Sequence, residues 1–254
     1  MRRPAVRARA RSLLGIAAAA AVLSLSAASA HAQARTVILT EAFDGGVVPL
    51  ASGDQLIVRL GGNAGSGYSW VAAFNDPALL PPAGPAAGEA APGGAGVRVF
   101  RFKAAASRGS ASLGFAWTRP SETEEPPGRV FRVLVTFGPS VVPKHHKLRD
   151  TDSGSRLYFT DGDTLIVRLP ATPSTGYGWA VLRSSPVLNQ AGEPQWEPAP
   201  SSSPGAEGAQ LVEFHVTGPG SAWLELGYKR PFEKDSAPTK TWSVFVATAG
   251  LEKK

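Results

Sequence analysis

Cysteine is absent from the 254 residues of this sequence. Disulfides, thiol nucleophiles and cysteine-ligated metal ions are therefore excluded from any account of its stability or chemistry. Each folded domain must be held together by its hydrophobic core, and the chain is long enough for two domains of ordinary size.

Histidine is also scarce, with four in the whole sequence. The adjacent pair His145 and His146 has no third ligand at a fixed spacing, which favours a solvated linker over a metal site. His215 lies within an expected strand, and Lys103 occupies the matching position in the first half of the chain. The sequence has no nucleophile elbow, phosphate-binding loop or dinucleotide fingerprint. We therefore expect no catalytic residue, no metal, no cofactor and no enzymatic activity.

A long hydrophobic run occurs only at the N-terminus. Five arginines and no acid precede or border the Ala- and Leu-rich stretch from Ser12 to Leu25, and overlapping A-x-A sequences follow between Ala28 and Ala34. This order is typical of a cleaved secretory signal peptide, residues 1–34, because the apolar run is shorter than the ~20 residues that a membrane-spanning helix needs. We expect an exported protein, periplasmic or secreted, that does not interact with a membrane.

Net charge is small once the signal peptide is set aside. The sequence has 26 basic and 20 acidic residues, and five of the arginines lie in the signal peptide, which leaves 21 basic residues against 20 acidic ones. A chain balanced in this way has no basic excess to neutralise phosphate groups. Nucleic acid is therefore not an expected partner.

The remaining chain contains two copies of one sequence module. Residues 54–60 (DQLIVRL) match residues 163–169 (DTLIVRL) at an offset of 109, and GYSW at 67–70 matches GYGW at 176–179 at the same offset. Further matches follow in the same order, GVRVFRF at 96–102 with GAQLVEF at 208–214 and WTRP at 117–120 with YKRP at 228–231. Several blocks in one order at a nearly constant offset indicate a tandem duplication.

Each copy is predicted to be all-β. Leu56, Val58 and Leu60 alternate with Ile57 and Arg59, and similar short runs are separated by Gly, Pro and Ser clusters. Residues 78–95 and 198–208 read as long loops, and no part of the mature chain shows sustained helical periodicity. Short strands at this density predict two tandem immunoglobulin-like β-sandwiches. The expected domains are residues 35–138 (copy one) and 156–250 (copy two), joined by a linker at 139–155.

Three loop segments recur in addition to the strands. They are NAGSGYSW at 63–70 with TPSTGYGW at 172–179, GGAG at 93–96 with GAEG at 205–208, and RPS at 119–121 with RPF at 230–232. Each has a plain structural explanation, since Trp70 and Trp179 are expected core anchors, glycines permit positive φ, and Arg-Pro can end a strand. Their occurrence in the same order in both copies is more specific than any one of them.

In this order the segments resemble those of the chagasin-like inhibitors of papain-family cysteine proteases. That family's pattern is N-P-T-T-G-Y/F-x-W, then G-x-G-G, then R-P-W, and the resemblance covers residues 36–137 and 156–248. TPSTGYGW is a close match and NAGSGYSW a looser one. Val97 and Ala209 replace the last glycine of the second motif, and Ala206 replaces its first glycine in copy two. The tryptophan of the third motif is Ser121 in copy one and Phe232 in copy two.

The resemblance implies a sandwich whose three loops form a wedge that fills the cleft of a papain-like cysteine protease, so that inhibition is reversible and competitive. The implied protease-binding residues of copy two are Thr172, Pro173, Ser174, Thr175, Gly176, Tyr177, Gly205, Gly208, Arg230, Pro231 and Phe232. Those of copy one are Asn63, Ser66, Gly67, Tyr68, Gly94, Gly96, Arg119 and Pro120. Thr175, Gly176 and Tyr177 would face the catalytic centre of the protease. The oligomeric state stays open.

Two other functions stay open at the level of sequence. One is an exported adhesion or assembly module that kept the scaffold while its loops drifted, which Ser121 and Val97 favour in copy one. Thr175 and Phe232 favour retained binding in copy two. The other is a carbohydrate-binding sandwich, which would need a planar aromatic platform that the sequence does not locate.

Overall fold

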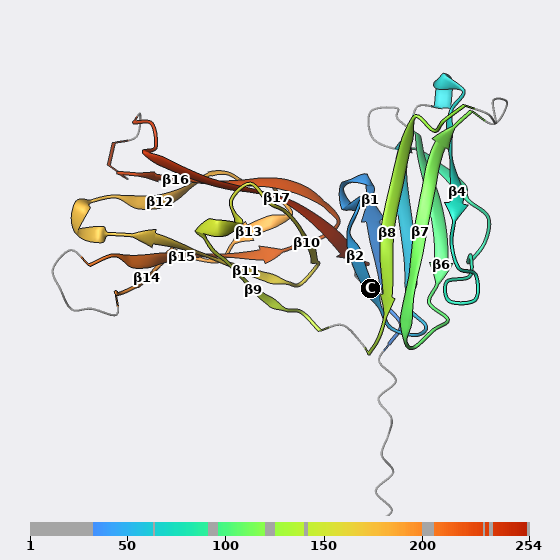
Figure 1. The fold of residues 1–254 in the computed structure, drawn as a ribbon, viewed down its shortest axis with the longest axis horizontal. Helices are drawn as coiled ribbons and strands as arrows, with labels where there is room; N and C mark the ends of the chain where they lie inside the picture. Colours follow the sequence, from blue (N-terminus) through green and yellow to red (C-terminus); the bar gives the residue numbers. More distant parts are fainter. Residues whose placement is uncertain are drawn as a thin grey trace, which may run out of the picture. The chain divides into compact units, whose positions relative to one another are not determined.

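The computed structural model describes residues 33–62, 64–90, 96–119, 125–139, 142–199, 206–230, 232–233 and 236–252. Only Gln33 and Ala34 of the expected signal peptide lie within them. These residues form β-strands and four short 3-10 helices, without an α-helix (Figure 1). No helix in the described ranges is long and apolar enough to cross a membrane. The prediction of an all-β chain is confirmed.

Copy one consists of two facing layers of strands. One layer has the order β1 (Thr36–Thr40), β3 (Gln55–Gly62), β6 (Gly96–Lys103) and β5 (Ala87–Ala90). The other has the order β2 (Val47–Leu50), β8 (Arg129–Phe137), β7 (Gly109–Thr118) and β4 (Ser69–Phe74). Short 3-10 helices follow β1 and β3, η1 at Glu41–Phe43 and η2 at Ala64–Ser66. Alternate residues of β3 face the core, where Leu56, Val58 and Leu60 are fully buried.

Copy two repeats this plan. One layer has β9 (His145–Leu148), β11 (Thr164–Ala171) and β15 (Gly208–Val216), and β15 also pairs with β13 (Leu188–Gln190) and β14 (Gln195–Glu197). The other layer has the order β10 (Arg156–Thr160), β17 (Lys240–Leu251), β16 (Gly220–Lys229) and β12 (Gly178–Arg183). The 3-10 helices η3 (Asp150–Asp152) and η4 (Pro173–Thr175) follow β9 and β11. Each copy has its own buried hydrophobic cluster.

The segment expected to be linker contains the first strand of copy two. β9 runs parallel to β11, with His145 opposite Thr164 and Leu148 opposite Val167. The assignment of residues 145–148 to the linker is therefore wrong, and copy two begins near Lys144. Leu148 is the only side chain of β9 that is buried in the core. The strand therefore lacks the alternation of apolar residues from which a strand can be predicted.

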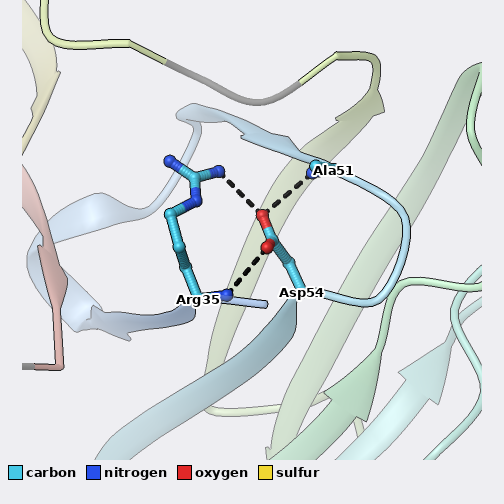
Figure 2. A network of polar contacts seen from close by, with 3 residues as sticks. All are labelled: Arg35, Ala51 and Asp54. Carbon is cyan, nitrogen blue, oxygen red and sulfur yellow. Dashed lines mark hydrogen bonds and ion pairs between the residues drawn. The ribbon is translucent and has the colours of Figure 1, made fainter. Parts of the chain in front are cut away.

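A buried aspartate fixes the start of each copy. The Asp54 carboxylate, 2% exposed, accepts hydrogen bonds from the backbone N–H of Arg35 (2.9 Å) and of Ala51 (2.9 Å) and from Arg35 Nη2 (2.7 Å) (Figure 2). Asp163 repeats the pattern in copy two, where Lys144 N, Thr160 N and His146 Nε2 lie within 2.9–3.1 Å of its oxygens. The carboxylate thereby ties the entering strand to the turn before the next strand, which explains why an aspartate opens both DxLIVRL blocks.

The last strand also contacts copy one. β17 continues to Leu251, and its end pairs antiparallel with β1, Val37 opposite Leu251 and Ile38 opposite Gly250. Ala247 and Ala249 of β17 belong to the hydrophobic cluster of copy one. The Tyr158 hydroxyl donates a hydrogen bond to the Asp44 carbonyl at 2.7 Å. Strand pairing thus joins the two copies in addition to the covalent chain.

Candidate functional site

The first loop of copy two is a compact turn between β11 and β12. Pro173 opens η4 with its fixed φ, and Thr175 closes it by donating its hydroxyl to the Thr172 carbonyl at 2.6 Å. Gly176 follows with φ of 75°, a left-handed conformation that favours glycine. Residues 173–176 are all exposed. The tip therefore offers backbone and the small hydroxyl side chains of Ser174 and Thr175, with no bulky or charged side chain.

Copy one builds the same turn from a looser sequence. Its 3-10 helix η2 ends at Ser66, Gly67 has the same φ of 75°, and the Tyr68 N–H donates to Ser66 Oγ at 3.3 Å. Ala64 and Gly65 stand where copy two has Pro173 and Ser174. The turn is the same, but the restraint that proline places on the unbound loop is missing.

The tyrosine of each first loop is held by the third loop. In copy two the ring of Tyr177 stacks on Tyr228 at 5.5 Å between centroids, and the Arg230 guanidinium lies over the same ring at 4.9 Å from its centroid. In copy one Tyr68 stacks on Trp117 at 6.0 Å, and Arg119 covers it at 4.6 Å. The recurring tyrosine and arginine therefore tie the first loop to the third one, a cation–π and stacking contact that stiffens both loops.

Arg230 is also paired within its own loop. Its Nη1 donates to Glu233 Oε1 at 2.9 Å, and this hydrogen bond raises the pKa of Arg230 above its ordinary value. The guanidinium therefore stays charged and oriented over Tyr177. Because both side chains of the pair are solvent-exposed, we assign it an orienting role and little stability.

Phe232 is the most exposed large hydrophobic side chain of the described residues, at 71%. Its ring lies against the tip of the first loop, since a Cβ added to Gly176 would be 3.7 Å from Phe232 Cε1. An aromatic ring that is exposed in this way has most of its surface left to bury against a partner.

The second loop reaches the same end of copy two. Gly208 pairs with Ala171 at the end of β11, directly before the first loop. Glu207 borders a hollow of about 280 Å³ together with Thr172, Thr175 and Tyr177 of the first loop and Tyr228 next to the third. The sequence prediction that the three segments lie together is therefore met by the described parts of the loops in copy two.

The structure gives Gly208 a packing reason that the sequence did not show. A Cβ at Gly208 would lie 2.5 Å from the Glu197 carbonyl oxygen and 2.7 Å from Trp196 Cζ2, so only glycine lets β14 cross here. Gly208 is buried, and its surface is covered by Trp196 rather than offered to a partner. Gly96, its counterpart, is half-buried and pairs with Gly62.

Five of the predicted binding residues lie outside the described residues, namely Asn63, Gly94, Pro120, Gly205 and Pro231. Trp70 and Trp179 are core anchors, as expected, with exposed fractions of 2% and 7%. Their indole N–H groups donate to the carbonyls of Gly61 and Pro170, both at 2.9 Å. The tryptophans therefore fix where each first loop leaves the sandwich.

The residues that hold the loops are not among the recurring loop residues singled out in the sequence. Tyr228 and Trp117 support the loop tyrosines, and Glu233 orients Arg230. A signal was present, because an aromatic residue stands two positions before the arginine in both WTRP and YKRP. It was read as part of a strand rather than as a partner of the first loop.

Both copies match a known family of proteins. Residues 50–135 and 158–246 each match the family model described as Chagasin family peptidase inhibitor I42. Amoebiasin-2 of Entamoeba histolytica is 27% identical over 104 residues, which span 40% of this chain and 85% of that protein.

Solved structures are similar to single copies of this chain. The cysteine protease inhibitor EhICP2 from Entamoeba histolytica is 24% identical, with a TM-score of 0.39, and covers 43% of this chain and 99% of its own. PbICP-C, solved in complex with falcipain-2, is 16% identical, with a TM-score of 0.29, and covers 43% of this chain and 94% of its own.

Proposed function

This chain belongs to the chagasin family of peptidase inhibitors, so it is not an enzyme, and we propose that it inhibits papain-like cysteine proteases reversibly and competitively through the loops of copy two. The observation that carries the proposal is the tip formed by Thr175 and Gly176 with the exposed ring of Phe232 beside it. Backbone and a small hydroxyl can enter a narrow cleft, and the aromatic ring supplies contact area at its side.

Pre-organisation is the physical reason to expect tight binding. The first loop is held by the hydroxyl of Thr175, by the restraint of Pro173 and by the contacts of Tyr177 with Tyr228 and Arg230. Ordering a loop upon binding costs about 0.5–1.5 kcal/mol for each immobilised side chain, and a loop that is already ordered avoids most of this cost. The scaffold therefore supports the wedge that the family resemblance implies.

A kinetic assay with papain tests the proposal. The mature protein should inhibit hydrolysis of a small fluorogenic peptide, and the apparent inhibition constant should rise linearly with substrate concentration because substrate and loops compete for one cleft. Dilution of the preformed complex should restore papain activity, since no covalent bond forms. Inhibition that does not depend on substrate concentration, or no inhibition at micromolar protein, would contradict the proposal.

We further propose that the protein is exported, on the strength of the sequence at residues 1–34. The mass of the protein purified from its native cells should correspond to a chain that begins near Gln33 or Arg35. A product that retains Met1 would overturn this proposal.

A further inference from the structure

Copy one contains a hollow that is larger than its counterpart in copy two, where Trp196 and Gln210 border a space of about 240 Å³. The hollow has a volume of about 380 Å³ and lies where β4, β5 and β6 meet the ends of β3 and β7. Its lining consists of Gly62, Tyr68, Ser69, Trp70, Gly88, Glu89, Gly96, Val97, Arg98 and Trp117. This volume falls within the range of about 300–1,000 Å³ that is usual for small-molecule sites.

Aromatic rings form one wall of the hollow. The indole of Trp117 lies against Gly62, where an added Cβ would be 2.2 Å from Trp117 Cη2, and Tyr68 stacks on Trp117 with an interplanar angle of 13°. Trp70 lies at 5.5 Å from Trp117, between ring centroids. The Arg129 guanidinium lies over the rings of Trp70 and Trp117, at 5.1 and 4.7 Å from their centroids, so the wall combines aromatic rings with a cation and favours a planar, anionic occupant.

The strand registers identify the residues that narrow the corresponding space in copy two. Gly88 faces Arg98 in copy one, and Trp196 faces Gln210 at the same point of copy two. Gln210 accepts a hydrogen bond from Trp179 N at 2.7 Å and donates one to Trp179 O at 2.9 Å, so it bridges the edges of the two layers.

In copy one this bridge is absent, because Arg98 stands in place of Gln210. Trp70 is opposite Trp117, just as Trp179 is opposite Tyr228, so its backbone N–H and C=O face the hollow by the same pairing pattern. A polar group of a bound molecule would find a donor and an acceptor there.

Charge favours an anionic occupant. Arg98 is exposed, and its guanidinium has no ion-pair partner within the part of the chain that the structure describes. The one acidic residue of the lining, Glu89, is already paired with Arg59 at 2.8 Å and Arg101 at 3.1 Å. A carboxylate that enters the hollow would therefore meet a free cation and a neutralised acid.

We propose that copy one binds a small planar aromatic carboxylate in this hollow, with the ring against Trp117 and Tyr68 and the carboxylate on Arg98. This function is independent of protease inhibition by copy two. Indole-3-acetate is a suitable probe, and indole and tryptamine are matched controls that carry the same ring without charge and with a positive charge.

Titration calorimetry of the mature chain tests the proposal. Indole-3-acetate should bind with a dissociation constant of about 0.1–1 mM, and tryptamine should bind at least about tenfold more weakly because it loses the contact with Arg98. Arg98→Met, which removes the charge without supplying the amide that bridges the layers in copy two, should weaken the binding of indole-3-acetate about tenfold and leave the binding of neutral indole unchanged. A Gly88→Trp variant should weaken binding of all three probes at least about tenfold, since it places a ring where Trp196 narrows the corresponding space of copy two.

The same variants supply the controls. A side chain at Gly88 meets no atom within 4 Å of its Cβ, so Gly88→Trp should keep the fold and should inhibit papain like the unmodified chain. Equal affinity for indole-3-acetate and tryptamine, or unchanged binding in Gly88→Trp, would overturn the proposal. So would the lack of saturable binding of indole-3-acetate at millimolar concentration.

Discussion

Replacing Phe232 by alanine should weaken inhibition of papain about thirtyfold while leaving the protein folded. A phenylalanine side chain buries on the order of 200 Å² when it is fully covered. With 71% of Phe232 exposed in the free chain, roughly 140 Å² remains to be buried against a protease, worth up to ~3.5 kcal/mol at 25 cal/mol per Å². Ordering costs reduce this, so we take ~2 kcal/mol, the usual threshold of a hot spot, as the expected loss.

The assay is competitive inhibition of papain by the mature chain, with urea unfolding as a check of stability. Phe232→Ala should leave the free energy of unfolding within about 0.5 kcal/mol, because the ring packs mainly against the loop tip. Trp223→Ala is the matched control, since Trp223 is also an exposed aromatic, at 45%, near the other end of β16 from the loops. An unchanged inhibition constant for Phe232→Ala, or an equal loss for Trp223→Ala, would refute the assignment of the loops.

Three further predictions follow from the comparison of the two copies. In a papain assay, Thr175→Arg should raise the inhibition constant of the mature chain by at least about tenfold, and Ser66→Arg should change it less than threefold. The reason is that copy one lacks the loop proline and the aromatic residue at position 121. The reverse order of effects would assign inhibition to copy one. Asp163→Ala should lower the free energy of unfolding by about 3 kcal/mol in urea denaturation, since it leaves two backbone N–H groups and His146 without their acceptor; a change below about 1 kcal/mol would contradict this role. A fragment of residues 144–252 should have a β-type circular dichroism spectrum and unfold cooperatively. A fragment that starts at Arg156 should not, because it lacks β9. Equal unfolding transitions of the two fragments would show that β9 is dispensable.

The sequence predicted those parts of the fold whose side chains alternate. The prediction of β3 and β11 as strands is correct because the two faces of a strand with the sequence DxLIVRL differ in polarity. In β3 the buried residues Leu56, Val58 and Leu60 are those that the alternation predicts. β9 was missed because three of its four residues are His or Lys. An edge strand of this kind is held by backbone hydrogen bonds to its neighbour. These bonds do not require apolar residues at alternate positions, so the sequence carries no such pattern.

The expected long loop at residues 78–95 shows the same limit. Its part at 87–90, with the sequence AGEA, forms β5 against β6, although alanine and glycine have low strand propensity. The strand exists because the backbone groups of β6 need partners, and its glycine is part of what leaves the hollow in copy one open. Local propensity could not reveal either point.

For the site, the sequence indicated which residues recur but not what each one does. Tyr177 and Arg230 are predicted to contact the protease, and the structure shows that they contact one another. Gly208 was expected in a binding loop and is instead buried beneath Trp196. A residue can therefore recur in a motif because of a contact within its own domain, and not because it contacts a partner.

This distinction explains how two copies with one fold can differ in function. The left-handed glycine, the tyrosine–arginine contact and the buried tryptophan occur in both copies, so they hold the loops in both and do not account for a difference in affinity between the copies. Other positions differ between the copies: Phe232 and Trp196 of copy two are replaced by Ser121 and Gly88 in copy one. The fold of the sandwich does not require an aromatic ring at either position. Exchanging an exposed ring for a small residue costs little stability, so a loop can lose one partner and gain another while the sandwich persists. Similarity over a whole copy is therefore dominated by positions that preserve the fold, and the choice of partner depends on the few positions that do not.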